Sequence, residues 1–218
     1  MNNAAREAIL GSIRSHLATS APYDKHELNH VFSRMDTETD PSFSVEICAQ
    51  FKASLEAVDG HCAIVQGDEG IVKALNQIVR GQYIAISDNP DVERLLQLTD
   101  LEIEELGIAP NAHDIFRFDT GISTVQAAIA ETGTLVLDST RERHRLVSLV
   151  PPVHIAIVRA SQIYRSLSEV LTLIRKDAEI SPAVTFITGP SRTADIELTL
   201  AIGVHGPQEL YVIIDEVN

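Results

Sequence analysis

The sequence contains only two cysteines, Cys48 and Cys62, among 218 residues. An iron–sulfur cluster normally takes four cysteine thiolates, so this chain alone cannot supply a complete conventional set of ligands. A small scaffold held together by disulfides is also excluded at this length and composition. Both cysteines lie in apolar stretches, "EICAQ" and "HCAIV", and this context is typical of ordinary buried thiols.

Long apolar runs are missing as well. No stretch approaches the ~20 apolar residues that a membrane-spanning helix needs. The stretch "MNNAAREAILGSIRSHL" interleaves Arg6, Glu7 and Arg14 with apolar residues, so it lacks the continuous apolar core of a signal peptide. We therefore expect a cytoplasmic protein without membrane insertion. With 44% hydrophobic and 22% charged residues, the composition is that of a globular chain with a sizeable core.

Basic residues are scarce, and the formal net charge is -14. The acidic excess lies almost entirely in residues 1–140. Nucleic acids and anionic membranes bind basic surfaces, so this charge disfavours both as partners. Solubility is the simplest explanation of the acidic part. The nearly neutral residues 141–218 are the part of the chain that would better tolerate a small anionic ligand.

The usual sequence motifs do not indicate a nucleotide, phosphate or metal site in this chain. No G-x-G-x-x-G follows a predicted strand and no G-x-x-x-x-G-K-[ST] occurs, so classical dinucleotide and P-loop sites are unsupported. "HELNH" at residues 26–30 matches the H-E-x-x-H pattern of zinc hydrolases. Its flanks, "APYDK" and "VFSRMDTETDP", do not favour the helix that this pattern requires, and no third ligand is evident nearby. We expect no metal site.

Strand and helix patterns alternate in the first half of the chain. Apolar spacing predicts a helix over residues 4–17, and the polar stretch 19–41 is typical of a linker. Further helices are expected at 42–58, 69–80 and 91–98, and strands at 62–66 and 82–87. This alternation favours an α/β fold with a largely parallel sheet covered by helices. We predict a helical N-terminal extension at residues 1–60 and an α/β domain at 61–218.

The second half is denser in short apolar runs. A helix is expected at 166–177, and residues 194–203 form a helix-like segment. Strands or strand-like runs are expected at 114–119, 133–138, 145–150, 154–159, 183–189 and 210–215. We find no internal repeat and no low-complexity tract, so the pattern indicates one α/β domain.

The segment "GPSRT" at residues 189–193 is the first candidate site, because it follows a predicted strand and precedes a predicted helix. Ligands gather at the carboxyl ends of strands in open α/β sheets, and helix N-termini offer free N–H groups. Arg192 could clamp a carboxylate or a phosphate through two hydrogen bonds. The alternative is a well-capped helix start, with Ser191, Thr193 or Asp195 as the cap. Composition alone leaves both interpretations open.

Four other features carry groups that suit chemistry. In "ETGT" at 131–134, Gly133 allows a sharp turn, and Glu131 is a candidate base, nucleophile or helix cap. The arginines within residues 141–145 form the densest basic cluster, or else a solvated loop. His154 follows a proline pair at a strand start, where it is either a site histidine or a structural one. His205 lies in the loop "GVHGP", where its pKa would suit proton transfer.

Four segments taken together resemble the LUD domain of the lactate utilization protein C (LutC/YkgG) family: "AIAETGTLVL", "SLVPPVHIAIV", "TGPSRTADIE" and "GVHGPQELYVIIDE". The resemblance covers roughly residues 110–218. It implies a three-layer α/β/α sandwich like that of the NagB/RpiA/CoA-transferase superfamily. It also implies a role in L-lactate catabolism, in which two iron–sulfur partner proteins help to oxidise L-lactate to pyruvate. This chain would then bind no cofactor itself, since the clusters would lie in the partners.

The resemblance also selects candidate site residues. The motif positions carried over as ligand-binding candidates are Thr132, Gly133, Thr134, Gly189, Ser191, Arg192, Thr193, Asp195, His205 and Gly206. Glu131 and His205 are the catalytic candidates. One alternative function is a stand-alone enzyme on the same scaffold that acts on a sugar phosphate or an acyl-CoA, with Glu131 as the nucleophile of CoA transfer. Another is a ligand-binding scaffold without turnover.

Overall fold

The structure is a computed structural model that forms two compact units, residues 1–37 and 38–218. It describes residues 6–7, 9–12, 14–15, 41–103, 105–108, 114–139, 145–176, 183–194, 200–202 and 206–216. The described residues of the first unit are helical, in line with the helix expected over residues 4–17. The second unit begins at residue 38. The sequence suggested residue 60 as the last residue of the N-terminal extension.

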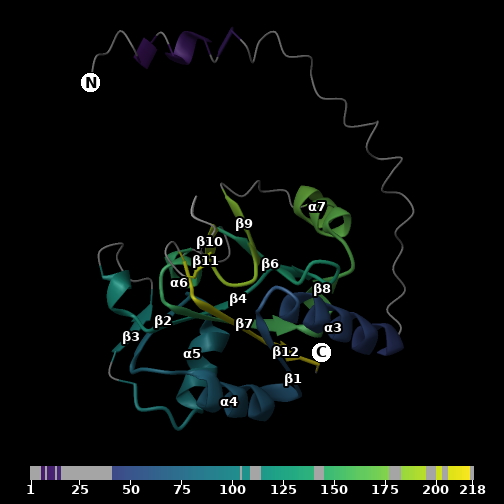
Figure 1. Ribbon diagram of the computed structural model, residues 1–218, viewed down its shortest axis with the longest axis vertical. Helices are drawn as coiled ribbons and strands as arrows, with labels where there is room; N and C mark the ends of the chain where they lie inside the picture. The colour runs from purple at the N-terminus through teal and green to yellow at the C-terminus, as the bar shows by residue number, and fades with distance from the viewer. Residues whose placement is uncertain are drawn as a thin grey trace. The chain divides into compact units, whose positions relative to one another are not determined.

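A six-stranded parallel sheet organises the second unit, in the order β1-β12-β7-β4-β2-β3 (Figure 1). Its strands are β1 (His61–Val65), β12 (Glu209–Asp215), β7 (Val153–Arg159), β4 (Thr120–Thr124), β2 (Tyr83–Ile86) and β3 (Glu105–Ile108). Strand β7 lies between β12 and β4, and all of its residues but the last are buried. Such a continuous apolar run is expected where a parallel strand is covered on both faces.

The two faces of this sheet bury different side chains, because successive residues of a strand point to opposite sides. Helices α4 (Gly67–Ile78) and α5 (Pro90–Gln97) cover one face, where Ile155 and Ile157 of β7 join their core. Helix α3 (Pro41–Glu56) packs on the other face, against Ala156 and Val158. The expected α/β fold with a parallel sheet flanked by helices is thereby confirmed.

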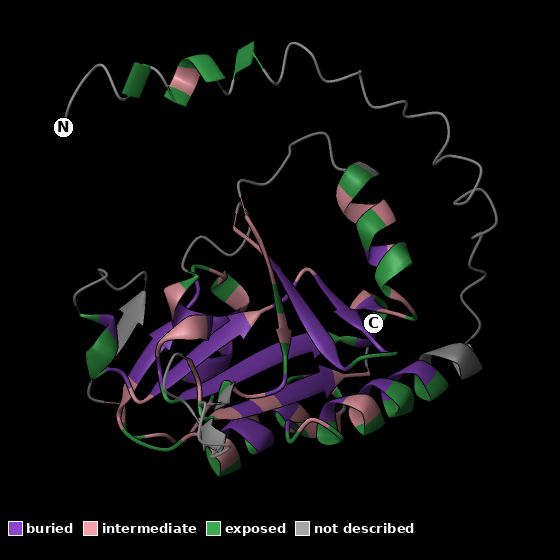
Figure 2. Cartoon of the chain, turned by 45° about the horizontal axis from the view of Figure 1, so that its top comes forward, coloured by how far each residue is buried: buried purple, intermediate pink, exposed green. Residues whose placement is uncertain are grey.

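A smaller four-stranded sheet packs on the same side as α3, in the order β8-β5-β6-β9. Its strands are β8 (Ile163–Tyr164), β5 (Ala127–Ile129), β6 (Thr134–Asp138) and β9 (Val184–Thr188). Strands β5 and β9 are antiparallel to β6, whereas β8 is parallel to β5. Leu135 and Leu137 point into the α3 core, and helix α7 (Leu167–Lys176) covers the opposite face through Val170. Figure 2 shows most strands of the two sheets as buried, whereas β9 is only partly buried.

The sequence misassigned three short elements. Residues Ile115–Arg117 form a 3-10 turn (η1) instead of a strand, because Ile115 and Phe118, three residues apart, both enter the same core. The run at 145–150 contains a short helix, α6 (Leu146–Leu149). In the helix-like segment, β10 (Arg192–Ala194) and β11 (Leu200–Ile202) instead pair as antiparallel strands. Periodicity cannot separate helix from strand in such short apolar runs.

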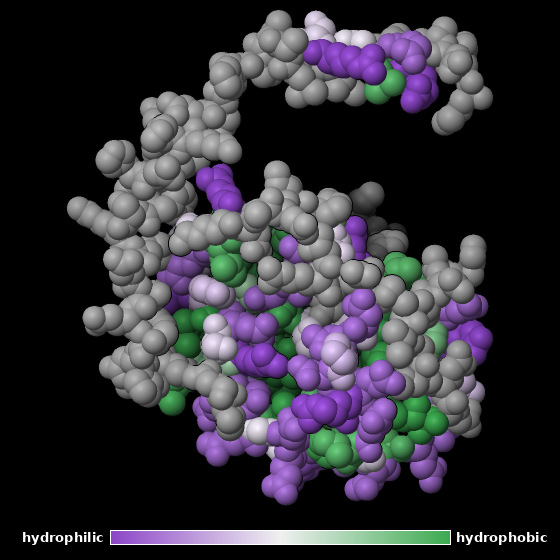
Figure 3. All heavy atoms as spheres, turned by 180° about the vertical axis from the view of Figure 1, so that it is seen from behind, coloured by the Kyte–Doolittle hydropathy of each residue, from purple (hydrophilic) through white to green (hydrophobic). Residues whose placement is uncertain are grey.

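The described surface mixes hydrophilic side chains with smaller apolar patches, as Figure 3 shows for one side. Within the described residues, no helix is both long enough and apolar enough to cross a membrane. The remaining short element, η2 (Ala160–Gln162), links β7 to β8.

His154 is a polar residue buried inside the main sheet. It is fully buried on β7, and its Nε2 lies 2.9 Å from the Ser123 Oγ of β4. Its Nδ1 has no hydrogen-bond partner within the part of the chain that the structure describes. Burial lowers the pKa of His154 from 6.5 to about 4, because desolvation disfavours the charged ring. Of the two interpretations of His154, its complete burial favours the structural one.

This buried histidine predicts a pH dependence of folding stability. The unfolded chain binds a proton at His154 below about pH 6.5, whereas the folded chain keeps the ring neutral down to about pH 4. The neutral His154 ring therefore makes its full contribution to the free energy of unfolding above pH 6.5. This contribution is lost as the pH falls towards 4, by up to roughly 3 kcal/mol. Urea unfolding between pH 8 and pH 4.5 should show a steeper loss for wild type than for His154→Gln. Equal slopes for the two proteins would contradict this account.

Candidate functional site

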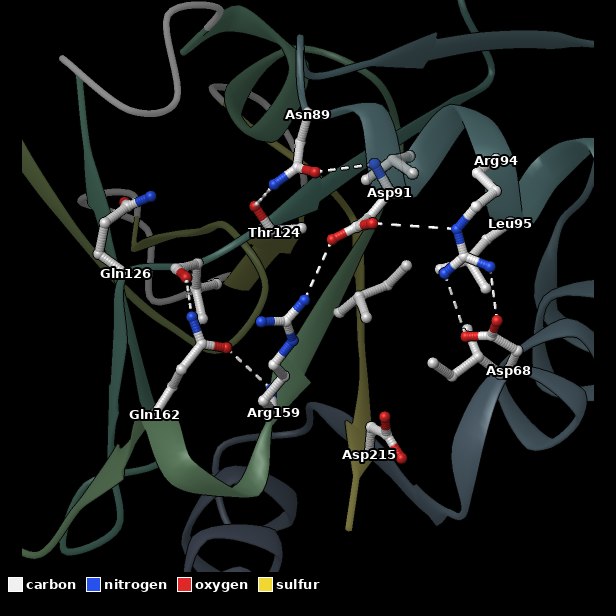
Figure 4. Close-up of a pocket in the computed structure, with 14 residues that line it drawn as sticks. Asp68, Asn89, Asp91, Arg94, Leu95, Thr124, Gln126, Arg159, Gln162 and Asp215 are labelled. Carbon is white, nitrogen blue, oxygen red and sulfur yellow. Dashed lines mark hydrogen bonds and ion pairs between the residues drawn. The ribbon is translucent and has the colours of Figure 1, made fainter. Parts of the chain in front are cut away.

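A cavity of about 330 Å³ opens where the parallel strands end (Figure 4). We call it the carboxyl-edge cavity; it is lined by Asp68, Ile71, Asn89, Asp91, Val92, Arg94, Leu95, Thr124, Val125, Gln126, Ile157, Arg159, Gln162 and Asp215. Three of these residues, Asp215, Arg159 and Thr124, are the last residues of β12, β7 and β4. The first turns of α4 and α5 complete the wall. Ligands of open α/β sheets bind at this position.

Neutral side chains hold the wall of the cavity in place. Asn89 caps helix α5: its Oδ1 accepts a hydrogen bond from the Asp91 N–H at 2.9 Å. The Nδ2 of Asn89 donates to Thr124 Oγ1 at 3.1 Å, which fastens the helix start to the end of β4. On the other side, Gln162 donates to the Val125 carbonyl at 2.6 Å and accepts from the Arg159 N–H at 2.8 Å. The site is thus braced by hydrogen bonds from several elements.

The charged side chains of the cavity are joined by ion pairs and hydrogen bonds and stay partly exposed to solvent. Arg94 holds Asp68 through two hydrogen bonds, and this pairing lowers the pKa of Asp68. Arg159 Nη2 donates to Asp91 Oδ2 at 3.1 Å, and Figure 4 shows the two side chains pointing toward one another. Asp215 Oδ1 accepts the Gly67 N–H at 2.8 Å. Since the Arg159 side chain is 63% exposed, its guanidinium is accessible to a ligand.

Sequence analysis selected none of these cavity residues. A usable signal existed, because Arg159 ends the strand expected at 154–159, and Asn89 and Asp91 follow the strand expected at 82–87. What the sequence could not show was which strands are neighbours in the sheet.

The motif segments meet at the opposite edge of the main sheet. Thr134 begins β6 and Thr188 ends β9, and their Oγ1 atoms lie 2.7 Å apart; Thr132 Oγ1 lies 2.7 Å from that of Thr134. The Ser191 N–H donates to the Pro207 carbonyl at 2.8 Å, just before β12 begins. Thus "ETGT", "TGPSR" and the end of "GVHGP" converge. We call the described residues 131–134, 188–192 and 206–207 the signature cluster.

Two glycines of the signature cluster let its loops touch the end of helix α3. Gly133 has a φ of +64°, and a Cβ there would lie 2.4 Å from the Leu55 nitrogen. Gly189 has a φ of +79°, and a Cβ there would lie 2.7 Å from the Val58 carbonyl oxygen. A side chain would meet both a left-handed backbone and a collision with main-chain atoms. Close packing therefore accounts for both glycines.

Arg192 also contacts the end of helix α3. Its Nη2 donates to the Val58 carbonyl at 3.3 Å, and its guanidinium forms an ion pair with Asp59. A cation is favourable beside the last carbonyls of a helix. Arg192 begins β10, so the helix start expected near Thr193 is wrong. A ligand-binding role for Arg192 stays a prediction, as it does for the whole motif set.

The other sequence candidates have these positions. The Glu131 Oε1 accepts the Leu167 N–H at 3.0 Å, so this carboxylate caps helix α7 in the structure. Glu131, Thr132 and Thr134 also line a second, mostly apolar groove of about 380 Å³, together with Ile129, Leu167, Leu171, Phe186 and Thr188. Gly206 lies against Ser191. The side chain of Thr193, and all of Asp195 and His205, lie outside the described residues.

No group of three or more histidine, cysteine, aspartate or glutamate side chains that could hold a metal ion occurs among the described residues. The "HELNH" segment and residues 141–144 lie outside them. Burial raises the pKa of Cys48 to about 11 and that of Cys62 to about 12, so both remain protonated thiols at neutral pH.

Comparisons with known proteins define the class. The LUD domain model matches residues 111–214. Lactate utilization protein C from Macrococcus caseolyticus is 30% identical over 192 residues, which cover 74% of this chain and 78% of that protein. The protein of the same name from Bacillus licheniformis is 37% identical over 101 residues, or 44% of this chain and 42% of that protein. The chain belongs to the lactate utilization protein C family.

Some matches cover only part of the relative's length. The matched segment spans 42% of the Bacillus licheniformis protein and 41% of an uncharacterized protein from Neisseria meningitidis that is 44% identical over 96 residues, or about two fifths of each. Among solved structures, a DUF162 family protein from Deinococcus radiodurans superposes with a TM-score of 0.58, over 79% of this chain and 98% of that one. At 22% identity, this likeness shows the shared fold alone.

Two glycines with the same φ of +64° give a matched test of the packing in the signature cluster. A Cβ at Gly67 would lie in open space, so Gly67→Ala should lower the free energy of unfolding only through the left-handed backbone, by roughly 1–2 kcal/mol. Gly133→Ala should cost roughly 1–3 kcal/mol more, because its Cβ collides with the backbone of α3. Free energies of unfolding in urea measure the difference. Equal losses in the two variants would show that the close approach of Gly133 to α3 is not needed.

Proposed function

We propose that this chain is a subunit of a system that oxidises L-lactate to pyruvate, and that its own task there is to bind a small anionic ligand. The observation that carries the proposal is the 30% identity to lactate utilization protein C of Macrococcus caseolyticus across 78% of that protein. Several other relatives of this name, including the one from Bacillus subtilis at 37% identity over 103 residues, support a role in lactate utilisation.

In this proposal, iron–sulfur partner proteins take up the two electrons that leave lactate. The two cysteines of the chain cannot complete a conventional four-thiolate cluster site. This feature supports a division of labour in which the clusters belong to the partners.

The carboxyl-edge cavity supports the ligand-binding part of the proposal. It combines an accessible guanidinium, that of Arg159, with neutral hydrogen-bonding groups and an apolar floor. Small-molecule sites commonly pair apolar walls with a few fixed polar groups of this kind.

Reconstitution with the iron–sulfur proteins of the same system tests the proposed function. Co-expression with this chain should yield a complex that forms pyruvate from L-lactate with an artificial electron acceptor. Leaving the chain out should abolish assembly or lower the rate at least tenfold, because ligand binding and assembly would then lack a component. Adding back the purified chain should restore the rate, whereas a heat-denatured sample should not. Unchanged assembly and unchanged rate without the chain would rule the proposal out.

A further inference from the structure

We propose that the carboxyl-edge cavity binds a hydroxylated or 2-oxo monocarboxylate, whose carboxylate pairs with Arg159 in place of Asp91. This inference rests on the small anionic ligand of the proposed function and names its site and chemical class. It assigns ligand binding to residues outside the signature cluster.

Arg159 has the capacity to bind an anion. A guanidinium carries five N–H donors, and the Asp91 contact of Arg159 uses Nη2 alone. The side chains of this pair are 63% and 47% exposed, and exposed ion pairs contribute about 0–1 kcal/mol. Exchange of Asp91 for a ligand carboxylate that takes two parallel hydrogen bonds is therefore favourable. Arg94 is less available, because it already holds Asp68 through two bonds.

The charge of the cavity favours a ligand with a single negative charge. Three carboxylates and two guanidinium groups line it, so the wall carries a small negative excess. The acidic residues in the first turns of α4 and α5 already offset part of the helix dipoles there. A phosphate dianion would meet twice the repulsion of a monocarboxylate. This balance selects the carboxylate among the compact anions that Arg159 could pair with.

The other groups of the cavity suit the remainder of such a ligand. Asn89 donates one of its two amide hydrogens to Thr124 Oγ1, and the second suits a hydroxyl or oxo oxygen of the ligand. Ile71, Val92 and Ile157 give an apolar wall against which a methyl or methylene group can pack. A volume of about 330 Å³ lies at the lower end of small-molecule sites. A three-carbon acid fits with several waters, and a longer hydroxy acid fits with fewer.

Calorimetric titration of the full chain at low salt tests the inference. L-lactate, pyruvate and gluconate represent the carboxylates, and glycerol 3-phosphate represents the phosphates. At least one carboxylate should bind, and more tightly than the phosphate. Arg159→Ala should weaken that binding at least tenfold, and Arg159→Lys less, because lysine keeps the charge but not the planar fork. Arg175→Ala, which removes an exposed arginine of α7 outside the cavity, is the control for net charge and should bind as wild type does.

A variant that is expected to bind the ligand more tightly separates a ligand-binding role of Arg159 from a purely structural one. Asp91→Asn removes the charge that competes for Arg159, so it should tighten binding a few-fold. Melting curves without ligand check that each variant is folded. Tighter binding of the phosphate, no binding of any carboxylate, wild-type affinity in Arg159→Ala, or loss of binding only in Arg192→Ala would each overturn the inference. The reconstitution can fail while Arg159 still binds a carboxylate, and can succeed while it does not, so the two proposals are tested separately.

Discussion

The structure depends on the parallel pairing of β7 between β12 and β4. Both neighbours satisfy the backbone of this strand, and its side chains are buried on both faces. Ile155 and Ile157 fix the α4 and α5 layer, whereas Ala156 and Val158 fix the layer of α3 and the smaller sheet. Because the three strands run in the same direction, their carboxyl ends deliver Arg159, Asp215 and Thr124 to one edge. The carboxyl-edge cavity is a consequence of this pairing.

The two edges of the main sheet differ in packing: the carboxyl edge borders an open cavity, whereas the amino edge is closely packed. At the carboxyl edge, Asn89 and Gln162 hold polar side chains around an open space. At the amino edge, Gly133 and Gly189 bring loops into contact with the end of α3, and Arg192 ties the same helix end to β10. The most recognisable motifs of the family thus have a packing explanation in this chain. The carboxyl-edge cavity is built mostly from residues outside those motifs, with Ile157 and Asp215 as the exceptions.

Strands β1, β2, β7 and β12 of the main sheet were predictable from the sequence, because they are apolar runs. No strand was expected at β3 (ELGI) or β4 (TGIST), where glycine and polar residues interrupt the apolar pattern. The helix starting at Pro90 and the strand that ends at Asp215 follow from local signals. Strands β10 and β11 were not expected, because the short apolar segment 194–203 fits helix and strand equally well, and the pairing of β10 with β11 decides between them. Tertiary contacts made the choice.

The candidate site was harder to predict for the same reason. Arg159 and Asp91 are 68 residues apart, and only the strand order brings them together. The motif positions were found by resemblance, but their location depends on the approach of residues 133 and 189 to helix α3, which no local pattern encodes. Local chemistry identified groups that could act, whereas topology determines which of them share a site.

Amide NMR spectra recorded during titration with the carboxylate that binds best test the central claim most directly. If the ligand occupies the carboxyl-edge cavity, the largest shifts will fall on Gly67, Asp91, Gln126 and residues 159–162. Residues 132–134 and 189–192 of the signature cluster will stay nearly unchanged, since they lie at the opposite edge of the sheet. Shifts centred on the signature cluster, with the cavity amides unmoved, would contradict the account.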